Sequence, residues 1–578
     1  MSGFLGLTMS DALLVVGILP LVVAVASWWL PPAAAKAASL AAAVVSLVGA
    51  AWLVGERRPV TAAAGWLRAD ALSVVFLLTV AFLYVVTVVF AIGYVDGHGG
   101  GHGGGQGGGQ GARQGGGHGG RQGGGQGAAS LAGPGRARIG SSGGSGARYQ
   151  RHLFAGLDLF CWAMLVAPLA SSLALVWVAI EVTTVVSALL VAIDDTDGAS
   201  EAAWKYILLA SLGLGIALLA VVVLYAAGAS VLGQGYELFT APLLTVASRL
   251  PKPLVTTAFL LAVVGFGTKM GLFPVHTWLP DAHSEAPTPV SALLSGALLA
   301  VSFYAILRFY EVAVRCLGAA LPRETLLAFG LASLAFAALS VARQRDLKRL
   351  LAYSSIEHMG ILAVGMSFSA TLAIVGVLLH VLAHAAAKGT AFFGAGNALR
   401  SLHTKDLRVI RGGLSLLPWG GPMLVLAVLA LSALPPFGIF RSELLIVAGG
   451  LQSGHDAVVL VLVGLTLLAT LGLTWYTSAI MLSPPAATPA SDPAGATTST
   501  LLETAAPAGR SAGAGPEAVT GRLAGAGPEP PPSRRNANGW IATSMVVGLV
   551  ALTVLGLHPP GSLMTLLTHA AIQLGGVR

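Results

Sequence analysis

Residues 268–290 read TKMGLFPVHTWLPDAHSEAPTPV, and this stretch decides the class of fold. Lys269 stands in an apolar helical run, and four prolines with several polar side chains follow it. Hydrocarbon can neither hydrogen-bond a broken backbone nor solvate an ammonium group, so such a segment has to be buried in protein and face a polar cavity. We therefore expect an ion or proton path here rather than a purely structural span.

The composition of the chain places this stretch in a membrane protein. Of the 578 residues, 55% are hydrophobic and only 10% are charged, whereas a soluble domain carries about 25% charged residues. We attribute the formal net charge of +8 to cytoplasmic loops, which carry an excess of Lys and Arg in membrane proteins. The sequence has no basic patch with interleaved aromatic residues of the kind that binds nucleic acid. We expect an all-α polytopic membrane protein with no nucleic-acid partner.

The sequence offers too few ligands for a redox centre. Cys161 and Cys316 are the two cysteines and belong to no C-x-x-C pair, whereas Fe–S and Ni–Fe centres need several thiolates. The phosphate-binding motif G-x-x-x-x-G-K-[ST] is absent, so no ATP-driven step is expected. We therefore expect no cofactor in this chain, with Fe–S, Ni–Fe or flavin groups only in partner subunits.

A membrane span needs about 20 apolar residues, and fourteen stretches satisfy this requirement. The first lacks the basic start and the cleavage site of a signal peptide, so we interpret it as a retained span. The fourth and fifth run together and are the least distinct pair. The predicted spans are 11–30, 36–54, 70–94, 153–170, 172–193, 204–228, 255–279, 289–311, 325–343, 349–367, 370–397, 418–448, 457–481 and 539–557.

Two segments lack the apolar content of a core and divide the chain. Residues 97–147 are a Gly-rich tract and residues 484–537 are rich in Pro, Ala and Gly, and both are predicted to be disordered loops. His98, His102 and His118 could bind a metal ion, but closing so flexible a run costs entropy, so no metal site is predicted. The predicted division is 1–96 with helices 1–3, 97–147, 148–311 with helices 4–8, 312–483 with helices 9–13, 484–537, and 538–578 with helix 14 and a short tail.

Positive charge is concentrated in four of the predicted loops. Arginine and lysine residues follow spans 3, 9, 11 and 13, which places them all on one side of the membrane. By the positive-inside rule that side is cytoplasmic and both termini face out, although Arg57 and Arg58 oppose this assignment. The expected location is the cytoplasmic (inner) membrane of a prokaryote.

Ionisable side chains inside the apolar spans are the candidate functional residues. A charge near the bilayer centre costs about 2.5–3.5 kcal/mol on insertion scales, so such groups are rare without a function. His380, His384 and Lys388 are spaced by four residues, which puts them on one helical face in a ladder about 12 Å long. Histidine titrates near neutrality and suits a proton relay. The predicted relay comprises Glu181, Lys205, Lys269, His380, His384, Lys388 and Glu443, with Glu357 and His358 as further members.

A structural interpretation stays open for several of these groups. Glu181, Lys269 and Lys388 could pair only to tether helices. Lys205 stands one helical turn after Glu201 near a helix end, where a local ion pair is common. Three polar groups around the turn between spans 7 and 8 could cap and brace that turn instead of moving protons: His276, Asp281 and His283.

The spacing of these groups indicates a repeat. Glu181 and Lys269 are 88 residues apart, and Glu357 and Glu443 are 86 residues apart. Each pair runs from an intact helix that carries a glutamate to a helix interrupted by proline. Interrupted spans at matching positions are typical of inverted repeats in transporters, so we expect two five-helix units, spans 4–8 and 9–13, with helices 7 and 12 broken.

Seven stretches resemble the antiporter-like membrane subunits of respiratory complex I (M-, N- and L-type), of Mrp cation/proton antiporters and of membrane-bound hydrogenases. SSIEHMG at 354–360 and PPFGIF at 435–440 make the chain look most like the F-type subunit of hydrogenase-4 and formate hydrogenlyase complexes. The matching stretches are 177–191, 201–213, 269–296, 346–360, 380–396, 404–414 and 435–445.

The resemblance implies roles for the predicted relay residues. Glu181 with Lys205 resembles the charge pair that gates a first half-channel. Lys269 resembles the central lysine of broken helix 7 at mid-membrane. His384 and Lys388 resemble the relay that connects the half-channels.

The second broken helix matches with some departures. Glu443 resembles the exit group of broken helix 12, where a carboxylate is typical of M-type subunits. Ala300 stands where relatives often place a lysine, and Ser295 stands where L-type relatives have histidine. The link between the half-channels is therefore left to water, to Lys269 or to His384. The long lateral helix of L-type subunits is not expected, because the tail after the last span is short.

The favoured interpretation is a proton-translocating, non-redox membrane subunit of a redox-driven complex, either hydrogenase-4-like or NADH:quinone oxidoreductase-like. Its expected partners are other membrane and peripheral subunits of a respiratory or hydrogenase-type complex, together with membrane lipid and protons. Three alternatives remain: a subunit of a multisubunit Mrp-type cation/proton antiporter, a proton-channel subunit coupled to inorganic-carbon uptake, and a membrane scaffold with vestigial channels.

Overall fold

The computed structural model describes residues 8–56, 58–96, 142–341, 343–402, 412–483 and 538–576. The described chain is almost entirely helical, with one two-stranded antiparallel hairpin of β1 (Val60–Ala62) and β2 (Leu67–Ala69). The helices are α1 (Met9–Ala26), α2 (Pro32–Leu53), α3 (Ala71–Asp96), α4 (Ser142–Leu169), α5 (Leu173–Val191), α6 (Asp197–Leu232), α7 (Thr240–Thr245), α8 (Lys252–Met270), α9 (Leu279–Glu285), α10 (Thr288–Leu293), α11 (Leu299–Leu317), α12 (Ala320–Val341), α13 (Leu347–Ser367), α14 (Thr371–Leu402), α15 (Gly413–Leu416), α16 (Gly420–Leu431), α17 (Gly438–Gln452), α18 (Asp456–Leu482), α19 (Gly539–Leu557) and α20 (Gly561–Gln573). Short turns are η2 (Ala63–Gly65), η3 (Ala192–Asp194), η4 (Ala247–Arg249) and the π-helical η5 (Leu294–Leu298).

Twelve of the described helices are long and apolar enough to cross a membrane. Two further predicted spans are helical but fall outside that set: α13 carries Lys348, Arg349 and Glu357, and span 12 is divided into α16 and α17. The adjoining fourth and fifth spans separate at residues 170–172, where the chain bridges to Leu67 of the hairpin. The predicted class, an all-α polytopic membrane protein, is confirmed, while the two five-helix units stay a prediction.

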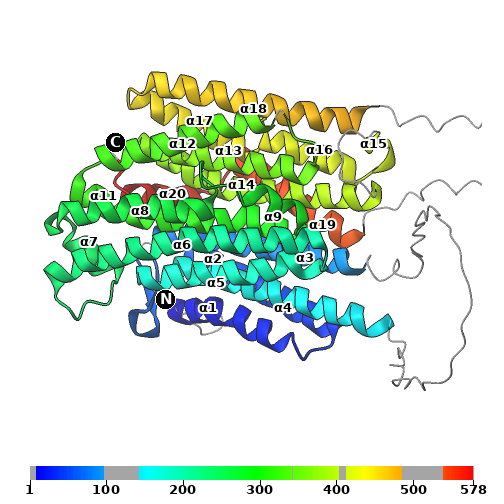
Figure 1. Ribbon diagram of the computed structural model, residues 1–578, viewed down its shortest axis with the longest axis horizontal. Helices are drawn as coiled ribbons and strands as arrows, with labels where there is room; N and C mark the ends of the chain where they lie inside the picture. Colours follow the sequence, from blue (N-terminus) through cyan, green and yellow to red (C-terminus); the bar gives the residue numbers. More distant parts are fainter. Residues whose placement is uncertain are drawn as a thin grey trace, which may run out of the picture.

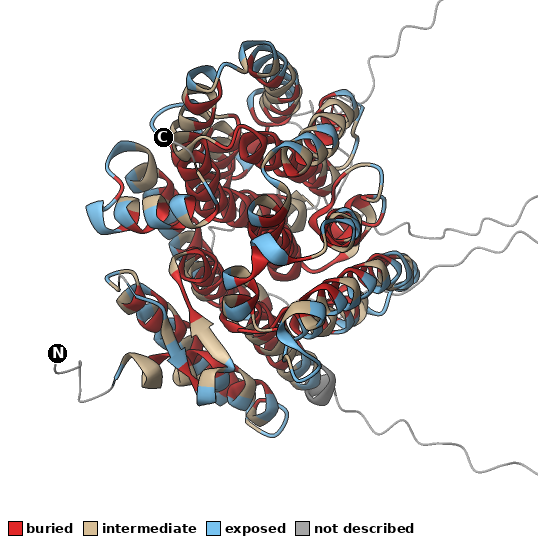
Figure 2. Cartoon of the chain, turned by 90° about the vertical axis from the view of Figure 1, so that its left-hand side faces the viewer, coloured by how far each residue is buried: buried red, intermediate tan, exposed pale blue. Residues whose placement is uncertain are grey.

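The long helices lie side by side along the long axis of the molecule (Figure 1). The centre is formed by α14 and by the continuous run of α10, η5 and α11. The most apolar window of that run is completely buried and that of α14 is 94% buried, against 22% for α18 at the edge. Figure 2 shows the same order, with buried residues inside and exposed residues on the outer helices. The helix that carries His380, His384 and Lys388 is therefore enclosed by other helices.

The ends of several helices agree with the predicted sidedness of the loops. The end of α3, the beginning of α4, the end of α18 and the beginning of α19 lie together toward the right of Figure 1. These ends flank the loops predicted after spans 3 and 13, both of which are expected on the positively charged side.

Glycines let the helix that carries Lys269 approach its neighbour. A Cβ atom on Gly213 of α6 would lie 2.4 Å from Cβ of Thr268, and one on Gly265 of α8 would lie 2.5 Å from the backbone nitrogen of Ala217. Real Cβ atoms do not come so close, so α6 and α8 pack at this distance only with glycine at both positions.

The short tail after helix 14 contains one more helix, α20, which the apolar runs did not indicate. This helix is 13 residues long and packs against α3 and α14. Leu563, Leu566 and Leu567 are buried, and their spacing of three and four residues makes one apolar face. The apolar run of α20 is too short to count as a span, so a prediction based on length does not identify it.

The low-complexity segments are described only at one edge. α4 begins at Ser142, so the end of the predicted Gly-rich loop is helical. The rest of residues 97–147, with its three histidines, and all of residues 484–537 lie outside the described residues, as do Arg57 and the basic residues of 403–411.

Candidate functional site

The first predicted interruption lies between α8 and α9. Gly271 adopts a left-handed conformation (φ 84°), which lets the N–H of Leu272 return to the carbonyl oxygen of Gly267 at 2.9 Å. The indole N–H of Trp278 donates to the carbonyl oxygen of Thr268 at 2.7 Å. Backbone groups at the break are thus bonded within the protein, which is the condition for interrupting a helix at membrane depth.

Lys269 is completely buried at the end of α8, and hydroxyl groups receive its ammonium group. Nζ donates to Thr184 Oγ1 of α5 at 2.8 Å and to the hydroxyl oxygen of Tyr206 of α6. Tyr206 in turn is hydrogen-bonded to Ser187 Oγ at 2.7 Å. The ammonium also lies 4.6 Å from the centre of the Tyr206 ring, a favourable cation–π distance. Neutral groups that can pass a proton therefore surround this cation.

Glu181 of α5 acts on Lys269 at longer range. Its carboxylate exerts a Coulomb attraction on the ammonium, but no ion pair joins the two among the described residues. Ser211 Oγ of α6 donates to Oε1 of Glu181 at 3.3 Å, whereas the buried Oε2 has no partner in the described part of the chain. A buried, unpartnered carboxylate oxygen is costly, and a water molecule or an arriving proton would satisfy it.

Lys205 is placed differently from the pair that the resemblance implies. Its Nζ lies 2.5 Å from Glu201 Oε1, and the two side chains are 40% and 59% exposed. Asp281 of α9 pairs nearby with Arg349 of α13 at 3.0 Å, and both charges act on Lys205. The structure thus gives Lys205 a local ion pair at a helix end, and its function with Glu181 stays a prediction.

Lys388 of α14 is a second completely buried lysine. Its Nζ donates to the carbonyl oxygen of Leu351 at 2.8 Å and to Ser354 Oγ, both on α13. Glu357 of α13 attracts Lys388 and is repelled by Glu443 of α17. Here too, a buried base lies within electrostatic reach of a buried acid.

Three imidazoles form a compact group where α13, α14 and α17 meet. His358 Nδ1 and His380 Nε2 are 3.1 Å apart, and the ring centre of His384 lies 5.1 Å from that of His358. His380 Nδ1 contacts Ser442 Oγ of α17 at 3.0 Å. Among the described residues, neither ring nitrogen of His384 has a hydrogen-bond partner. The same is true of Oε1 of Glu443. All three ionisable groups of α14 face α13, in keeping with their spacing of four.

His283 of α9 connects the first broken helix to α14. It is completely buried, its ring stacks on Phe392 at 5.3 Å, and Lys388 acts on it electrostatically. Neither of its nitrogens has a partner within the described ranges. A second connection is made by Ser295 of η5 and Ser355 of α13, whose hydroxyl oxygens are 2.7 Å apart. Polar groups of α9 and η5 thus lie beside those of α13 and α14.

Four hydroxyl groups around the relay were not predicted from the sequence. These are Thr184 and Tyr206 at the first lysine, Ser354 at the second, and Ser442 at the imidazoles. Thr184 follows Glu181 by three residues and so shares its helical face. Spacing from a predicted glutamate is therefore a signal that could have found it, whereas the partner on α6 depends on packing alone.

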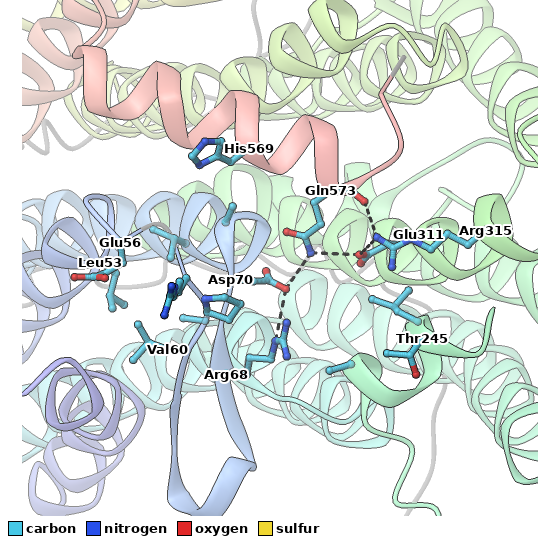
Figure 3. A pocket seen from close by; sticks show the side chains of 17 residues that line it. Leu53, Glu56, Val60, Arg68, Asp70, Thr245, Glu311, Arg315, His569 and Gln573 are labelled. Atoms are coloured by element: carbon cyan, nitrogen blue, oxygen red, sulfur yellow. Dashed lines mark hydrogen bonds and ion pairs between the residues drawn. The ribbon is translucent and has the colours of Figure 1, made fainter. Parts of the chain in front are cut away.

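A second buried charge cluster, also missed, lies where α3 begins. Arg308 of α11 is 4% exposed and donates to Asp70 Oδ1 at 2.7 Å and to Glu311 Oε2 at 3.1 Å. Figure 3 shows Gln573 of α20 between the two carboxylates, to which its amide donates at 3.0 and 3.4 Å, beside a cavity of about 460 Å³. Burial alone would raise the pKa of Asp70, but the charge and hydrogen bonds of Arg308 hold that pKa below its usual range.

The fold and the site define a polytopic α-helical membrane protein with acids, bases and imidazoles buried beside two broken helices. The family described as "NADH:quinone oxidoreductase/Mrp antiporter, TM" matches residues 170–469, and the chain belongs to this family. The matched region covers spans 5–12 and all nine predicted relay residues. The resemblance stated from the sequence is confirmed.

Individual relatives agree with this assignment. The chain is 41% identical over 302 residues to the hydrogenase-4 component F homolog of Methylacidiphilum infernorum (isolate V4), which covers 52% of this chain and 62% of that relative. The fold is similar to a chain of the Mrp complex from Dietzia sp. DQ12-45-1b, with a TM-score of 0.73, 19% identity, and 98% and 97% of the two chains covered. It is also similar to a chain of respiratory complex I from Thermus thermophilus, with a TM-score of 0.64, 22% identity, and 96% and 98% covered. These two likenesses concern the fold.

Proposed function

We propose that the chain is a proton-translocating membrane subunit of a redox-driven complex, hydrogenase-4-like or NADH:quinone oxidoreductase-like. The observation that carries the proposal is the repeated placement of a completely buried lysine that donates to a side-chain hydroxyl group and lies within electrostatic reach of a glutamate. Lys269 has this placement relative to Glu181, and Lys388 has it relative to Glu357. Chains of this family occur as subunits of hydrogenase-4 and of complex I, which supports partner subunits here.

Protons move through this chain by changes of charge at the two lysines. A proton on Lys269 is attracted by Glu181 and can leave through Tyr206 or Thr184, which accept hydrogen bonds from Nζ. His283 and the pair Ser295–Ser355 lead toward Lys388, with water between the groups. In the second half Glu357, the three imidazoles and Glu443 continue the path. At close range in a low-dielectric interior, a change at one charge alters its neighbour's proton affinity by several kcal/mol.

The energy source and the surroundings of the chain follow from the same proposal. Redox centres reside in partner subunits, because this chain's two cysteines cannot hold a cluster. The partners are other membrane and peripheral subunits of a respiratory or hydrogenase-type complex. The chain spans the cytoplasmic membrane of a prokaryote, with both termini outside and the basic loops in the cytoplasm.

The test compares Lys269→Met with Lys252→Met in the purified complex, reconstituted in liposomes with a pH-sensitive dye inside. Both lysines belong to α8, but Lys252 is exposed at its first turn. With hydrogen, formate or NADH as electron donor, we expect Lys269→Met to abolish proton uptake while the complex still assembles. Lys252→Met should transport as the natural chain does.

Two results would overturn the proposal. One is proton uptake by Lys269→Met at the rate of the natural chain. The other is purification of the natural complex without any redox subunit, combined with Na⁺- or K⁺-dependent proton exchange, which would identify an Mrp-type antiporter instead.

A further inference from the structure

Three side chains beside the second broken helix are arranged as ligands of a metal ion. His358 of α13, His380 of α14 and Glu443 of α17 each offer one ligand atom, and all three atoms lie within 4.8 Å of one another. His358 Nδ1 and His380 Nε2 are 3.1 Å apart. Two nitrogens bound to one tetrahedral zinc ion at 2.0–2.1 Å lie about 3.3 Å apart, so a small movement of the rings would admit the ion.

The hydrogen bond between His380 and Ser442 leaves the lone pair of the neutral imidazole on Nε2, the nitrogen needed to bind a metal ion. Ser442 uses its own hydrogen on the carbonyl oxygen of Ile439 at 2.7 Å, so its Oγ accepts the Nδ1–H of His380 at 3.0 Å. The lone pair of the neutral imidazole is then on Nε2, which faces His358. Partners of this kind, which fix the tautomer and orientation of a metal-binding histidine, are usual in metal sites.

The other two ligands have unpartnered atoms. Oε1 of Glu443 and Nε2 of His358 are buried without a partner among the described residues. Binding of a metal ion by Nδ1 of His358 requires only that its proton move to Nε2, the nitrogen that lacks a partner. The Glu443 side chain as a whole is of intermediate burial, whereas both histidines are buried.

The charge balance also favours a dication. Glu357 is buried on the same turn of α13 as His358 and is repelled by Glu443. A doubly charged ion bound here would offset the cost of ionising carboxyl groups in a low-dielectric interior. Lys388 opposes the ion, since its charge also acts on the imidazoles, but its ammonium group is already hydrogen-bonded to Leu351 and Ser354 of α13.

We propose that His358, His380 and Glu443 bind a divalent transition-metal ion of the zinc type, with water as a fourth ligand, and that the bound ion blocks the second half of the proton path. Nitrogen and carboxylate ligands are those that zinc accepts, and an open fourth position is usual where a site has three protein ligands. Binding depends only on the three residues, whereas the block rests on the function proposed above.

The binding test uses the full chain in lipid nanodiscs, purified with a tag that contains no histidine. A background variant carries His98→Ala, His102→Ala and His118→Ala, because spaced histidines in the Gly-rich tract could bind zinc themselves. The protein is loaded with ZnCl₂, separated from free metal over a weak chelator, and assayed by mass spectrometry. Loading with Co²⁺ gives a second readout, since a tetrahedral site produces visible absorption bands.

The expected result is one zinc ion per chain in the background variant, with cobalt absorption. His358→Gln and His380→Gln should each lose the metal, and Ser442→Ala should bind it about 10–100-fold more weakly. His384→Gln, which changes a neighbouring imidazole outside the ligand set, should keep it. Zinc retention by His358→Gln and His380→Gln equal to the background, or no retained metal in the background itself, would refute the site.

Proton uptake by the reconstituted complex tests whether the bound ion blocks the proton path, separately from whether the metal binds. Zinc should inhibit proton uptake by the natural complex, and the Ser442→Ala complex should need a zinc concentration about 10–100-fold higher for the same fractional inhibition of its own uptake. Inhibition of both alike would refute the block while leaving the binding result in place. Absence of proton uptake without zinc would instead count against the function proposed above.

Discussion

The ammonium nitrogen of Lys269 lies 2.8 Å from the hydroxyl oxygen of Thr184, and no carboxylate is within ion-pair distance of it among the described residues. A fixed ion pair would hold the lysine charged and its side chain still. Hydroxyl partners can accept a hydrogen bond from the ammonium or donate one to the neutral amine, so they serve both protonation states. This difference separates a relay lysine from a tether between helices.

Tyr206→Phe should slow proton uptake by about 10–100-fold. The substitution removes one of the two hydroxyl partners of Lys269, and a hydrogen bond to a charged group contributes about 1.5–3 kcal/mol. Tyr225→Phe is the matched control, because Tyr225 belongs to the same helix and donates to the carbonyl oxygen of Gln234 at 3.1 Å, away from the relay. The initial rate of uptake in liposomes measures both variants, and equal rates would contradict the role of Tyr206.

Exchanging Glu201 and Lys205 separates two interpretations of the pair. If the pair is only a local ion pair on the surface of α6, the double variant Glu201→Lys/Lys205→Glu keeps proton uptake within about twofold, since exposed pairs contribute about 0–1 kcal/mol. We expect this outcome. Loss of uptake in the exchanged protein, with assembly intact, would show that Lys205 acts with Glu181 as the resemblance implies.

His283→Leu should reduce proton uptake at least about tenfold, because a positioned proton-transfer group contributes a factor of this order or more. His283 is completely buried and faces α14. His276→Leu is the matched control from the same break, because the ring of His276 packs against Phe336 of α12 at 4.3 Å instead. Electron transfer is measured in parallel, and a fall in both activities would indicate a defect of assembly rather than of the relay.

Arg308→Met should destabilise the protein by about 3–5 kcal/mol, the usual cost of leaving buried partners of an ion pair uncompensated. Asp70 and Glu311 would both lose the guanidinium. Arg315→Met removes a contact to Glu311 from a side chain that is 40% exposed, so its effect should be below about 1 kcal/mol. Thermal unfolding in detergent ranks the two, and an equal loss would contradict a buried clamp at Arg308.

The buried cluster of Asp70, Arg308 and Glu311 should make the stability of the protein fall at strongly acidic pH. The pKa of Asp70 is held below its usual range, so its carboxylate stabilises the fold above the unfolded value of about 3.9. This contribution is lost as the pH falls through the lower pKa of the folded state. The difference in unfolding temperature between the natural protein and Asp70→Asn should therefore be constant from pH 8 to pH 5. It should shrink only below about pH 4, and a change near pH 6 would contradict the assignment.

The apolar runs predict most of the helices because membrane spans are defined by length and composition, which are local properties. The run Gly271–Trp278 predicts its own break, since glycine and proline act through backbone geometry at the residue itself. α20 shows the limit of this reasoning. Its apolar face is buried against α3 and α14, and Gln573 reaches Asp70, a residue far away in the sequence.

The candidate site shows the same division. The sequence by itself determined that ionisable groups lie inside the bundle, because charge within an apolar span is visible residue by residue. It also determined that His380, His384 and Lys388 share one face, because helical period is local. Only the tertiary structure decided the partners that come from other helices: Tyr206 and Thr184 for Lys269, and His358 with Glu443 beside His380. Those contacts depend on the rotation and depth at which helices pack, and many residues distributed along the chain set both together.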